Sequence, residues 1–255
     1  MYSFIDGFSG YHQIRIAPED HHKTTFVTEA GCYQYTVMPF GLKNAPAIFS
    51  SVFIATFKEY IHKFFEVYFD DWMVFNLFKD HKGSLRLMLD RCMQYQISLN
   101  FKKCIFGVPF GILLRQIACK QGMMVDSKKI AIIVNLAPLG FSNKLRTTLG
   151  HTGYYRKFIK GYAQITTPLE KLLKKDIKYK WTEECQHNFD ILKENMVTAP
   201  ILVFPDWKKE FHVHVDASPV VRGIILAQQG EGDLDRPIYF SSRKLSTKEK
   251  KIHYD

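Results

Sequence analysis

Two adjacent carboxylates, Asp70 and Asp71, interrupt an otherwise apolar run from Val67 to Phe75. Burying charged groups inside such a run costs free energy unless the chain turns there or a cation offsets the charge. The run therefore predicts two short strands that are joined at the acids, with both carboxylates at one end of a sheet. Taken alone, an Asp-Asp pair is better interpreted as the polar corner of a hairpin.

A third acid ends another strand-like piece. Asp6 closes the segment Phe4-Ile5-Asp6, and a turn around Gly7 and Gly10 follows it. If the two strand regions lie side by side, three carboxylates meet at one sheet end. Hard divalent cations, Mg²⁺ above all, prefer such an oxygen-only cluster. Two metals held by shared Asp side chains suit phosphoryl transfer, and no Ser, Cys or His nucleophile is needed.

The excess positive charge lies in one internal block. The 255 residues hold 35 Lys and Arg against 25 Asp and Glu, a net charge of +10. Residues 120–180 hold thirteen of these bases and three of the acids, which accounts for the whole excess. Aromatic residues such as Tyr154 and Phe158 are interleaved with the bases. This mixture favours a phosphate-backbone partner, and a solvated helical face is an equally good interpretation of the charge alone.

Composition excludes several classes of protein. Apolar residues make up 46% of the chain, which is enough for a globular core and too much for a disordered chain. The five cysteines are widely spaced without a C-x-x-C pair, so we expect free thiols in a reducing compartment. No apolar run approaches the roughly 20 residues of a membrane span, and no signal peptide is evident. We therefore expect an intracellular protein of the cytoplasm or nucleus, with no membrane partner.

Hydrophobic periodicity and turn residues predict the elements. A hairpin is expected over residues 24–38, with Gly31 at its turn. A helix over residues 46–65 is expected to start at Asn44, a capping side chain, and Pro46. Further helices are expected over 80–96, 126–136 and 145–173, broken near Pro138 and Pro168. Residues 198–206 predict a linker, strands follow at 211–215, 223–228 and 237–241, and residues 246–249 form a capping box.

Several segments, taken in order, resemble the reverse transcriptase part of a Gypsy-type long-terminal-repeat retrotransposon polyprotein. Residues 4–14 resemble the first catalytic motif of that family, residues 38–49 its template and nucleotide-binding motif, and Tyr68-Phe69-Asp70-Asp71 its double-aspartate signature. Segments within residues 145–159 resemble its connecting region, and residues 181–185 and 198–202 are also similar to that family. Residues 211–218 resemble the first strand of the ribonuclease H domain that follows. The match runs over nearly the whole chain.

The resemblance implies an α+β fold with three parts. Residues 1–118 would be a polymerase palm, a ferredoxin-like sheet with helices on one face, from which most of the fingers are missing. Residues 119–200 would be a basic, helical thumb and connection. Residues 201–255 would be the first part of a ribonuclease H-like domain with an incomplete sheet.

The implied activity is RNA-directed DNA synthesis, a nucleotidyl transfer that uses Mg²⁺, or Mn²⁺ in its place. The partners would be an RNA/DNA primer–template and deoxynucleotide triphosphates, gripped in part through phosphates. The residues expected to take part are, for catalysis and metal binding, Asp6, Asp70 and Asp71; for the nucleotide, Tyr11, Phe40, Gly41 and Lys43; for the primer–template, Arg146, Arg156, Lys157 and Lys160; and, as a ribonuclease H remnant, Asp216.

Departures from the family pattern lower the expected activity. A Phe-Leu-Gly-His run is usual where this chain has Leu113-Leu114-Arg115-Gln116, and Arg115 cannot adopt a glycine backbone freely. The missing fingers, and an acid expected just beyond the last residue, lead us to expect a weak or inactive enzyme without ribonuclease activity.

The alternatives are a non-catalytic, nucleic-acid-binding remnant of a transposon polyprotein and a nuclease that acts through Asp216. His212, His214 and Asp216 alternate along one strand face and could bind a transition metal. Two incidental surface histidines are the simpler interpretation.

Overall fold

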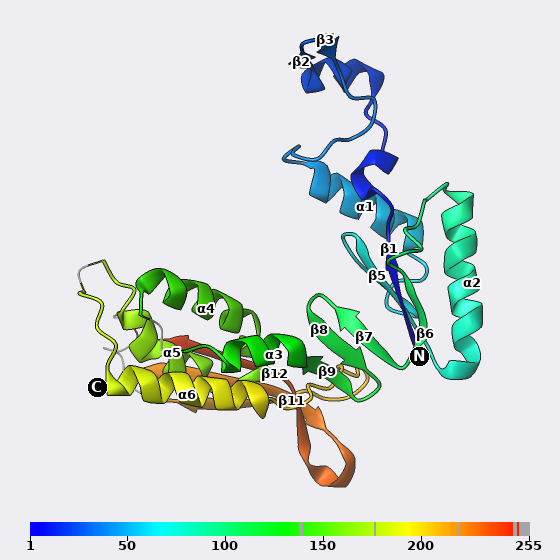
Figure 1. Ribbon diagram of the computed structural model, residues 1–255. Coiled ribbons are helices and arrows are strands. Elements are labelled where there is room, and N and C mark those ends of the chain that lie inside the picture. Colours follow the sequence, from blue (N-terminus) through cyan, green and yellow to red (C-terminus); the bar gives the residue numbers. More distant parts are fainter. Residues whose placement is uncertain (138–139, 176, 219, 247–248, 250–255) are drawn as a thin grey trace. The chain divides into compact units, whose positions relative to one another are not determined.

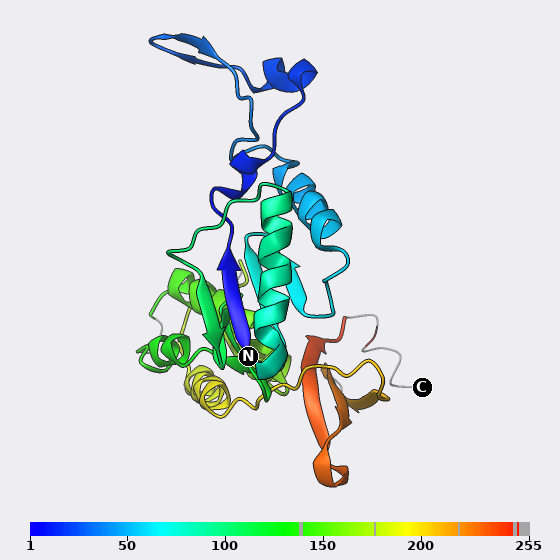
Figure 2. The ribbon, with the colours of Figure 1, turned by 90° about the vertical axis from the view of Figure 1, so that its right-hand side faces the viewer.

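The computed structural model describes residues 1–137, 140–175, 177–218, 220–246 and 249. The chain divides into two compact units, Met1–Leu114 and Arg115–Asp255. Figures 1 and 2 show helices and strands in both units, so the predicted α+β class is confirmed. The three-part division at residues 118 and 200 stays a prediction.

The first unit is built on a four-stranded sheet with the order β4-β5-β1-β6, and the neighbouring strands are antiparallel. Two helices supply apolar residues to the same core. The bounds are β1 (Tyr2–Asp6), α1 (Ala45–Phe57), β4 (Phe65–Tyr68), β5 (Asp71–Phe75), α2 (Phe78–Gln94) and β6 (Ile105–Val108).

Side-chain alternation explains why both helices of this unit cover one face of the sheet. Along β1 and β5, Ile5 lies opposite Trp72, and these residues point into the core with Val74. The helices add buried residues at helical spacing, for example Phe49 and Phe53 from α1. Burial of so many aromatic side chains makes this core the main source of stability in the unit.

A separate hairpin belongs to the first unit. It consists of β2 (Phe26–Thr28) and β3 (Gly31–Tyr33), which confirms the hairpin predicted over residues 24–38. The 3-10 helices η1 (Gly10–Gln13) and η2 (Pro18–Thr24) precede it. Figures 1 and 2 show that the hairpin extends away from the sheet of this unit, and its six residues are all exposed.

Helix α1 is shorter than the sequence predicts. It ends at Phe57, and Phe65, the end of the predicted helix, is instead the first residue of β4. Between them His62 adopts a left-handed backbone with φ of 65°, which no helix interior allows. The aromatic residues of this turn still face the core, and they extend the apolar pattern beyond the helix end. Asn44 also makes no side-chain capping hydrogen bond, contrary to expectation.

The second unit begins with strands and continues as a helical segment before three more strands. Its sheet elements are β8 (Gln116–Cys119), β9 (Gly122–Val125), β10 (His212–Ala217), β11 (Val221–Gln229) and β12 (Asp235–Lys244), and β7 (Phe110–Leu113) ends the first unit. Its helical elements are α3 (Ser127–Val134), α4 (Ser142–Tyr154), η3 (Arg156–Phe158), α5 (Tyr162–Lys171), α6 (Glu183–Val197) and η4 (Glu231–Asp233).

Residues 198–206 are not a free linker, because Leu202 is anchored in the core of the second unit and Ala199 packs against that core. Leu202 is buried, and it exchanges backbone hydrogen bonds of 2.7 and 2.9 Å with Met123. The same core holds Phe240 from β12 together with residues of α4, α5 and α6. The helices and the β10-β11-β12 sheet therefore fold around one interior.

The chain does not break at Pro168, contrary to expectation, since α5 runs through it. Pro168 and Leu169 are buried there, so packing offsets the missing N–H group. The break predicted near Pro138 lies outside the described residues. The predicted capping box is present, because Ser246 and Glu249 exchange hydrogen bonds of 2.9 and 3.3 Å.

In the part of the chain that the structure describes, every helix is too short or too polar to cross a membrane.

Candidate active site

Strand pairing brings Asp6 and Asp71 together. Asp6 is the last residue of β1, Asp71 is the first of β5, and the two are direct partners across the antiparallel pair. Cross-strand partners have neighbouring side chains on the same face of a sheet. The two acids that the sequence separates by more than sixty positions therefore share one sheet end.

Asp70 lies in the tight turn that joins β4 to β5, and we call residues 69–71 the carboxylate turn. Tyr68 pairs with Asp71, so only Phe69 and Asp70 form the loop. Phe69 has a φ of 50°, a left-handed conformation that costs a bulky residue about 1–2 kcal/mol. The Trp72 indole N–H donates a 2.8 Å hydrogen bond to the Phe69 carbonyl, which holds the turn in place. Strain that surrounding structure maintains in this way is typical of functional sites.

The acids repel one another in the folded chain. Burial, followed by the charges of Asp6 and Asp71, raises the pKa of Asp70. Burial and the charge of Asp6 raise the pKa of Asp71. The nearest compensating cation is the Lys103 ammonium, 3.8 Å from Asp6 Oδ2, and its side chain is largely exposed. Such a cluster favours an additional positive charge.

The donor set fits a hard divalent cation. All three side chains offer carboxylate oxygens, and Asp70 Oδ1 is buried without a hydrogen-bond partner among the described residues. Within those same residues, no group of three His, Cys, Asp or Glu side chains is already gathered as a metal cluster. The structure thus brings the predicted acids to one place and leaves a buried oxygen that lacks a partner.

Two of the residues expected to bind the nucleotide, Tyr11 and Phe40, form an aromatic cluster with Phe49. The Tyr11 ring meets Phe40 edge-on at 5.0 Å between centroids and Phe49 at 5.3 Å. Phe49 is fully buried, whereas Phe40 is 66% exposed. The cluster therefore joins the core to a solvent-accessible aromatic face.

Gly10 connects the aromatic cluster to the carboxylate turn. A Cβ atom on Gly10 would lie 2.5 Å from Asp70 Oδ1 and 2.9 Å from the Phe49 ring. Only a glycine leaves room for this approach. Gly41 has a φ of 100°, which also favours glycine, and Lys43 is exposed just before α1.

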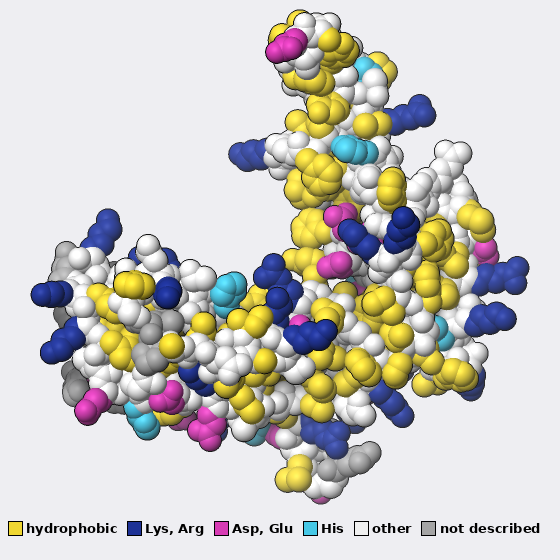
Figure 3. Space-filling view, viewed as in Figure 1, with side chains coloured by type: hydrophobic (Ala, Val, Ile, Leu, Met, Phe, Trp, Pro, Cys, Tyr) yellow, Lys and Arg dark blue, Asp and Glu magenta, His cyan; other side chains and the backbone are white. Residues whose placement is uncertain are grey.

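The four predicted primer–template residues do not share one environment. Arg146 on α4, Arg156 in η3 and Lys160 are exposed. Lys157 is half-buried, with Nζ 3.2 Å from Met123 Sδ, and burial lowers its pKa. In Figure 3, Lys and Arg side chains lie among exposed hydrophobic ones on the visible face of the helical part of the second unit.

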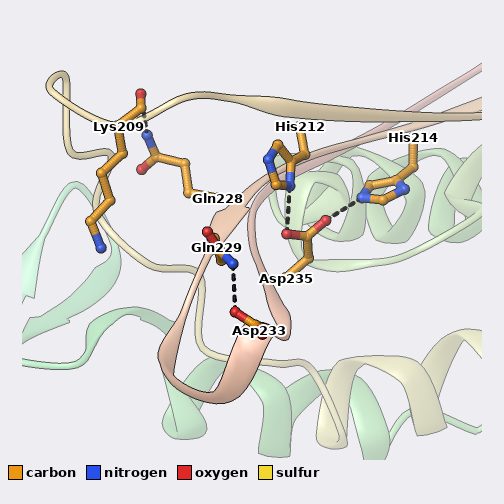
Figure 4. Close-up of polar contacts among 7 residues, drawn as sticks. All are labelled: Lys209, His212, His214, Gln228, Gln229, Asp233 and Asp235. Atoms are coloured by element: carbon orange, nitrogen blue, oxygen red, sulfur yellow. Dashed lines mark hydrogen bonds and ion pairs between the residues drawn. The ribbon is translucent and has the colours of Figure 1, made fainter.

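His212 and His214 contact Asp235 instead of forming a cluster with Asp216. His212 Nδ1 lies 2.7 Å from Asp235 Oδ1, and His214 Nε2 lies 2.6 Å from Oδ2. Figure 4 shows the Asp235 carboxylate between the two imidazoles. These hydrogen bonds, from His214 and then His212, lower the pKa of Asp235. Asp216 is exposed on β10.

The sequence did not single out Lys103 or the contact of Gly10 with Asp70. Lys103 is one of two consecutive lysines in a turn, and nothing in the local pattern distinguishes it from Lys102. The glycine was recognised only as a turn residue. Its close approach to Asp70 depends on strand pairing across sixty residues, which no local signal encodes.

Comparison with known proteins decides the family. Residues 1–152 match the family model described as reverse transcriptase (RNA-dependent DNA polymerase). The chain belongs to the reverse transcriptase family. Residues 181–254 match the model of an RNase H-like domain found in reverse transcriptase. Reverse transcriptases generally use divalent metal ions, in agreement with the oxygen donor set at β1 and β5.

Similar curated proteins are polyproteins of transposons. The chain is 36% identical to the retrovirus-related Pol polyprotein from transposon opus of Drosophila melanogaster, over 97% of this chain and 26% of that protein. It is 29% identical to the transposon Tf2-3 polyprotein of Schizosaccharomyces pombe, over 96% of this chain and 18% of that protein. The chain therefore spans about a quarter of the length of such relatives, or less.

Solved structures show the same fold. A foamy viral protease-reverse transcriptase in complex with RNA/DNA hybrid superimposes with a TM-score of 0.87 at 22% identity, over 98% of this chain and 34% of that chain. The same foamy viral protein in complex with double-stranded DNA gives a TM-score of 0.85. This likeness extends over both units of the chain.

Proposed function

We propose that this chain is the reverse transcriptase segment of a Gypsy-type long-terminal-repeat retrotransposon polyprotein, that Asp6, Asp70 and Asp71 are its site of RNA-directed DNA synthesis, and that its activity is impaired by the departures from the family pattern. The observation that carries the proposal is the pairing of Asp6 with Asp71 beside the carboxylate turn. A third acid, Asp70, completes the set, and its buried Oδ1 has no hydrogen-bond partner among the described residues. Like charges at this density are stabilised by cations, and phosphoryl transfer needs cations at that place.

The three acids would hold Mg²⁺, or Mn²⁺ in its place. When bound, the metal favours the ionised primer 3′-hydroxyl and offsets the negative charge that develops on the phosphate. The chain itself supplies orientation. The Trp72 hydrogen bond fixes the carboxylate turn, and the absence of a Cβ on Gly10 lets Asp70 lie against the aromatic cluster.

The nucleotide would lie on the aromatic cluster. Tyr11 would contact the sugar, and Phe40 and Gly41 would line the nascent base pair. The exposed ring of Phe40 offers a surface for stacking. Lys43, exposed before the first turn of α1, would contact a phosphate.

The primer–template would be held through its phosphates by the exposed basic side chains of Arg146, Arg156 and Lys160. The charge of the 120–180 block and the nucleic acids present in the foamy viral complexes support this part of the proposal. The same block would also serve a catalytically inactive remnant, so catalysis must be tested separately from binding.

Primer extension on an RNA template with Mg²⁺ tests the proposal. We expect a low yield of product from the wild-type chain and a further loss of about a hundredfold or more in Asp70→Asn, because one carboxylate charge is removed from the site. Asp90→Asn is the matched control, since Asp90 lies on α2 in an exposed pair with Arg86. Equal background in wild type and Asp70→Asn, together with retained duplex binding, would establish the non-catalytic remnant instead.

A further inference from the structure

A cavity lies wholly within the unit of residues 115–255, between α3 and α4. Its volume is about 730 Å³, which lies in the range of small-molecule sites. The apolar part of its lining comes mainly from Ile132, Ile133 and Leu136 on and after α3, and from Tyr155 at the end of α4. None of the residues assigned above to the polymerase reaction or to the primer–template lines it.

The Lys, Arg and His side chains that line the cavity come without any acidic side chain beside them in the described lining. They are Arg115, Lys129, Lys144 and His151, and the described lining includes no Asp or Glu. Lys129, Lys144 and Arg115 have no carboxylate partner among the described residues, and all three are exposed. The Lys144 ammonium lies over the Phe141 ring, 5.4 Å from its centroid. Cations without a carboxylate partner in the described part of the chain, placed around a concave apolar surface, attract an anion that carries an apolar body.

The wall of the cavity also offers groups that suit an aromatic base. Tyr154 lines it and meets Tyr155 edge-on at 5.1 Å between ring centroids. Thr148, which is 5% exposed, also lines the cavity and contributes a hydroxyl group from α4. Aromatic faces bind nucleobases by stacking, and a hydroxyl can hydrogen-bond to the polar edge of a base.

We propose that the α3–α4 cavity binds a nucleoside phosphate, with the base against Ile132, Tyr154 and Tyr155 and the phosphate on Lys129 and Lys144. The chemistry is shared by a free nucleotide and by an unstacked nucleotide within a single strand. The site is independent of the carboxylates, and its occupancy needs no divalent metal.

The test is calorimetric titration of the full-length chain with dAMP in EDTA, which removes metal-dependent binding at the acids. Lys129→Gln/Lys144→Gln should weaken dAMP binding by about tenfold or more, because two charge-assisted contacts to the phosphate are lost. Lys128→Gln is the matched control, since Lys128 neighbours Lys129 on α3 but does not line the cavity. Its affinity should stay within about twofold of wild type.

A second variant blocks the cavity without removing charge. Gly150 lines the cavity on α4, and an added Cβ there meets nothing within 4 Å. Gly150→Leu should retain the fold, because Leu is a better helix former than Gly, and should abolish dAMP binding. Gly83→Leu on α2, which also has open space at its Cβ, is the control. Thermal unfolding of both variants verifies that they are folded.

Ligand variants identify which part of the nucleotide is recognised. Adenosine and deoxyribose 5-phosphate should each bind about tenfold more weakly than dAMP, since each lacks one half of the ligand. A single-stranded oligonucleotide that competes better than dAMP would identify the strand as the source, and weaker competition would identify the free nucleotide.

Undetectable dAMP binding up to about 1 mM, or equal binding in Gly150→Leu, would overturn the proposal. Asp70→Asn should bind dAMP as wild type does, so failure of primer extension and failure of this site are separate results.

Discussion

At the scale of single residues, Gly10 is where the carboxylate turn and the aromatic cluster come closest. In Gly10→Ala the new methyl group would displace Asp70 Oδ1 and the Phe49 ring. We expect a loss of stability of about 1–3 kcal/mol and a larger proportional loss of primer extension. Chemical denaturation and extension assays measure the two effects. Gly83→Ala, in an open position inside α2, should leave primer extension unchanged and should raise stability by up to about 1 kcal/mol, because Ala is the better helix former. A fully active Gly10→Ala would contradict the proposed site.

His81 makes the stability of the first unit depend on pH. Its Nε2 lies 2.8 Å from Ser3 Oγ, while Nδ1 is buried without a partner in the described part of the chain. Burial, and then the N-terminal ammonium, lowers the pKa of His81. The unfolded chain therefore takes up a proton at about pH 6.5 that the folded chain does not, and stability falls as the pH drops below that value.

Above about pH 6.5 we expect His81 to make its full contribution to the free energy of unfolding. This contribution is lost as the pH falls toward the lower pKa of His81 in the folded state. Urea denaturation between pH 5 and 8 of wild type and His81→Gln checks this. The variant should lose less stability toward pH 5, because Gln does not titrate. Parallel curves for the two proteins would show that another group causes the pH dependence.

At the scale of elements, Leu114 and Arg115 form a turn with φ of 49° and 59°. The sequence predicts that a left-handed backbone, which glycine adopts freely, costs Arg115 free energy. The structure shows Arg115 in that left-handed conformation. Arg115→Gly should therefore raise the free energy of unfolding by about 1–2 kcal/mol. Arg115→Ala keeps the Cβ and should not stabilise the chain. Equal effects of Gly and Ala in chemical denaturation would attribute the change to the side chain rather than to the backbone.

The sequence predicts those elements whose signal is local. The double-aspartate run yields β4 and β5, and the capping box at Ser246 and Glu249 forms as expected. The end of α1 was wrong because core-facing aromatics of the following turn imitate a helical stripe. Pro168 was wrongly taken as a break, since burial of its neighbours outweighs one missing hydrogen bond.

The candidate site was predictable in its acids and aromatics because each stands in its own short motif. Its spatial details were not. The contact of Gly10 with Asp70, the position of Lys103 and the burial of Lys157 all depend on tertiary packing. The same is true of Asp235, which His212 and His214 contact from a non-neighbouring strand.

At the scale of the whole molecule, the net charge of +10 predicts binding to nucleic acid that weakens steeply with salt. An individual Lys or Arg side chain contributes to this salt dependence only if it reaches a phosphate. Arg156→Gln should lower the slope of log affinity against log salt concentration by about 0.9 for duplex DNA. Lys157→Gln should leave the slope unchanged, because Lys157 is directed at Met123. Fluorescence anisotropy over a salt series measures both, and a lower slope in Lys157→Gln would contradict this assignment.

The Trp72 side chain is fully buried against Phe53 and Phe57, at 4.8 and 5.8 Å between ring centroids, and the same indole holds the carboxylate turn. A substitution at Trp72 therefore changes both the packing of the core and the geometry of the carboxylate turn. Among related transposon sequences, substitution at position 72 should be accompanied by compensating changes at positions 53 and 57. An alignment in which the three positions vary independently would show that natural variation has found another way to secure the turn.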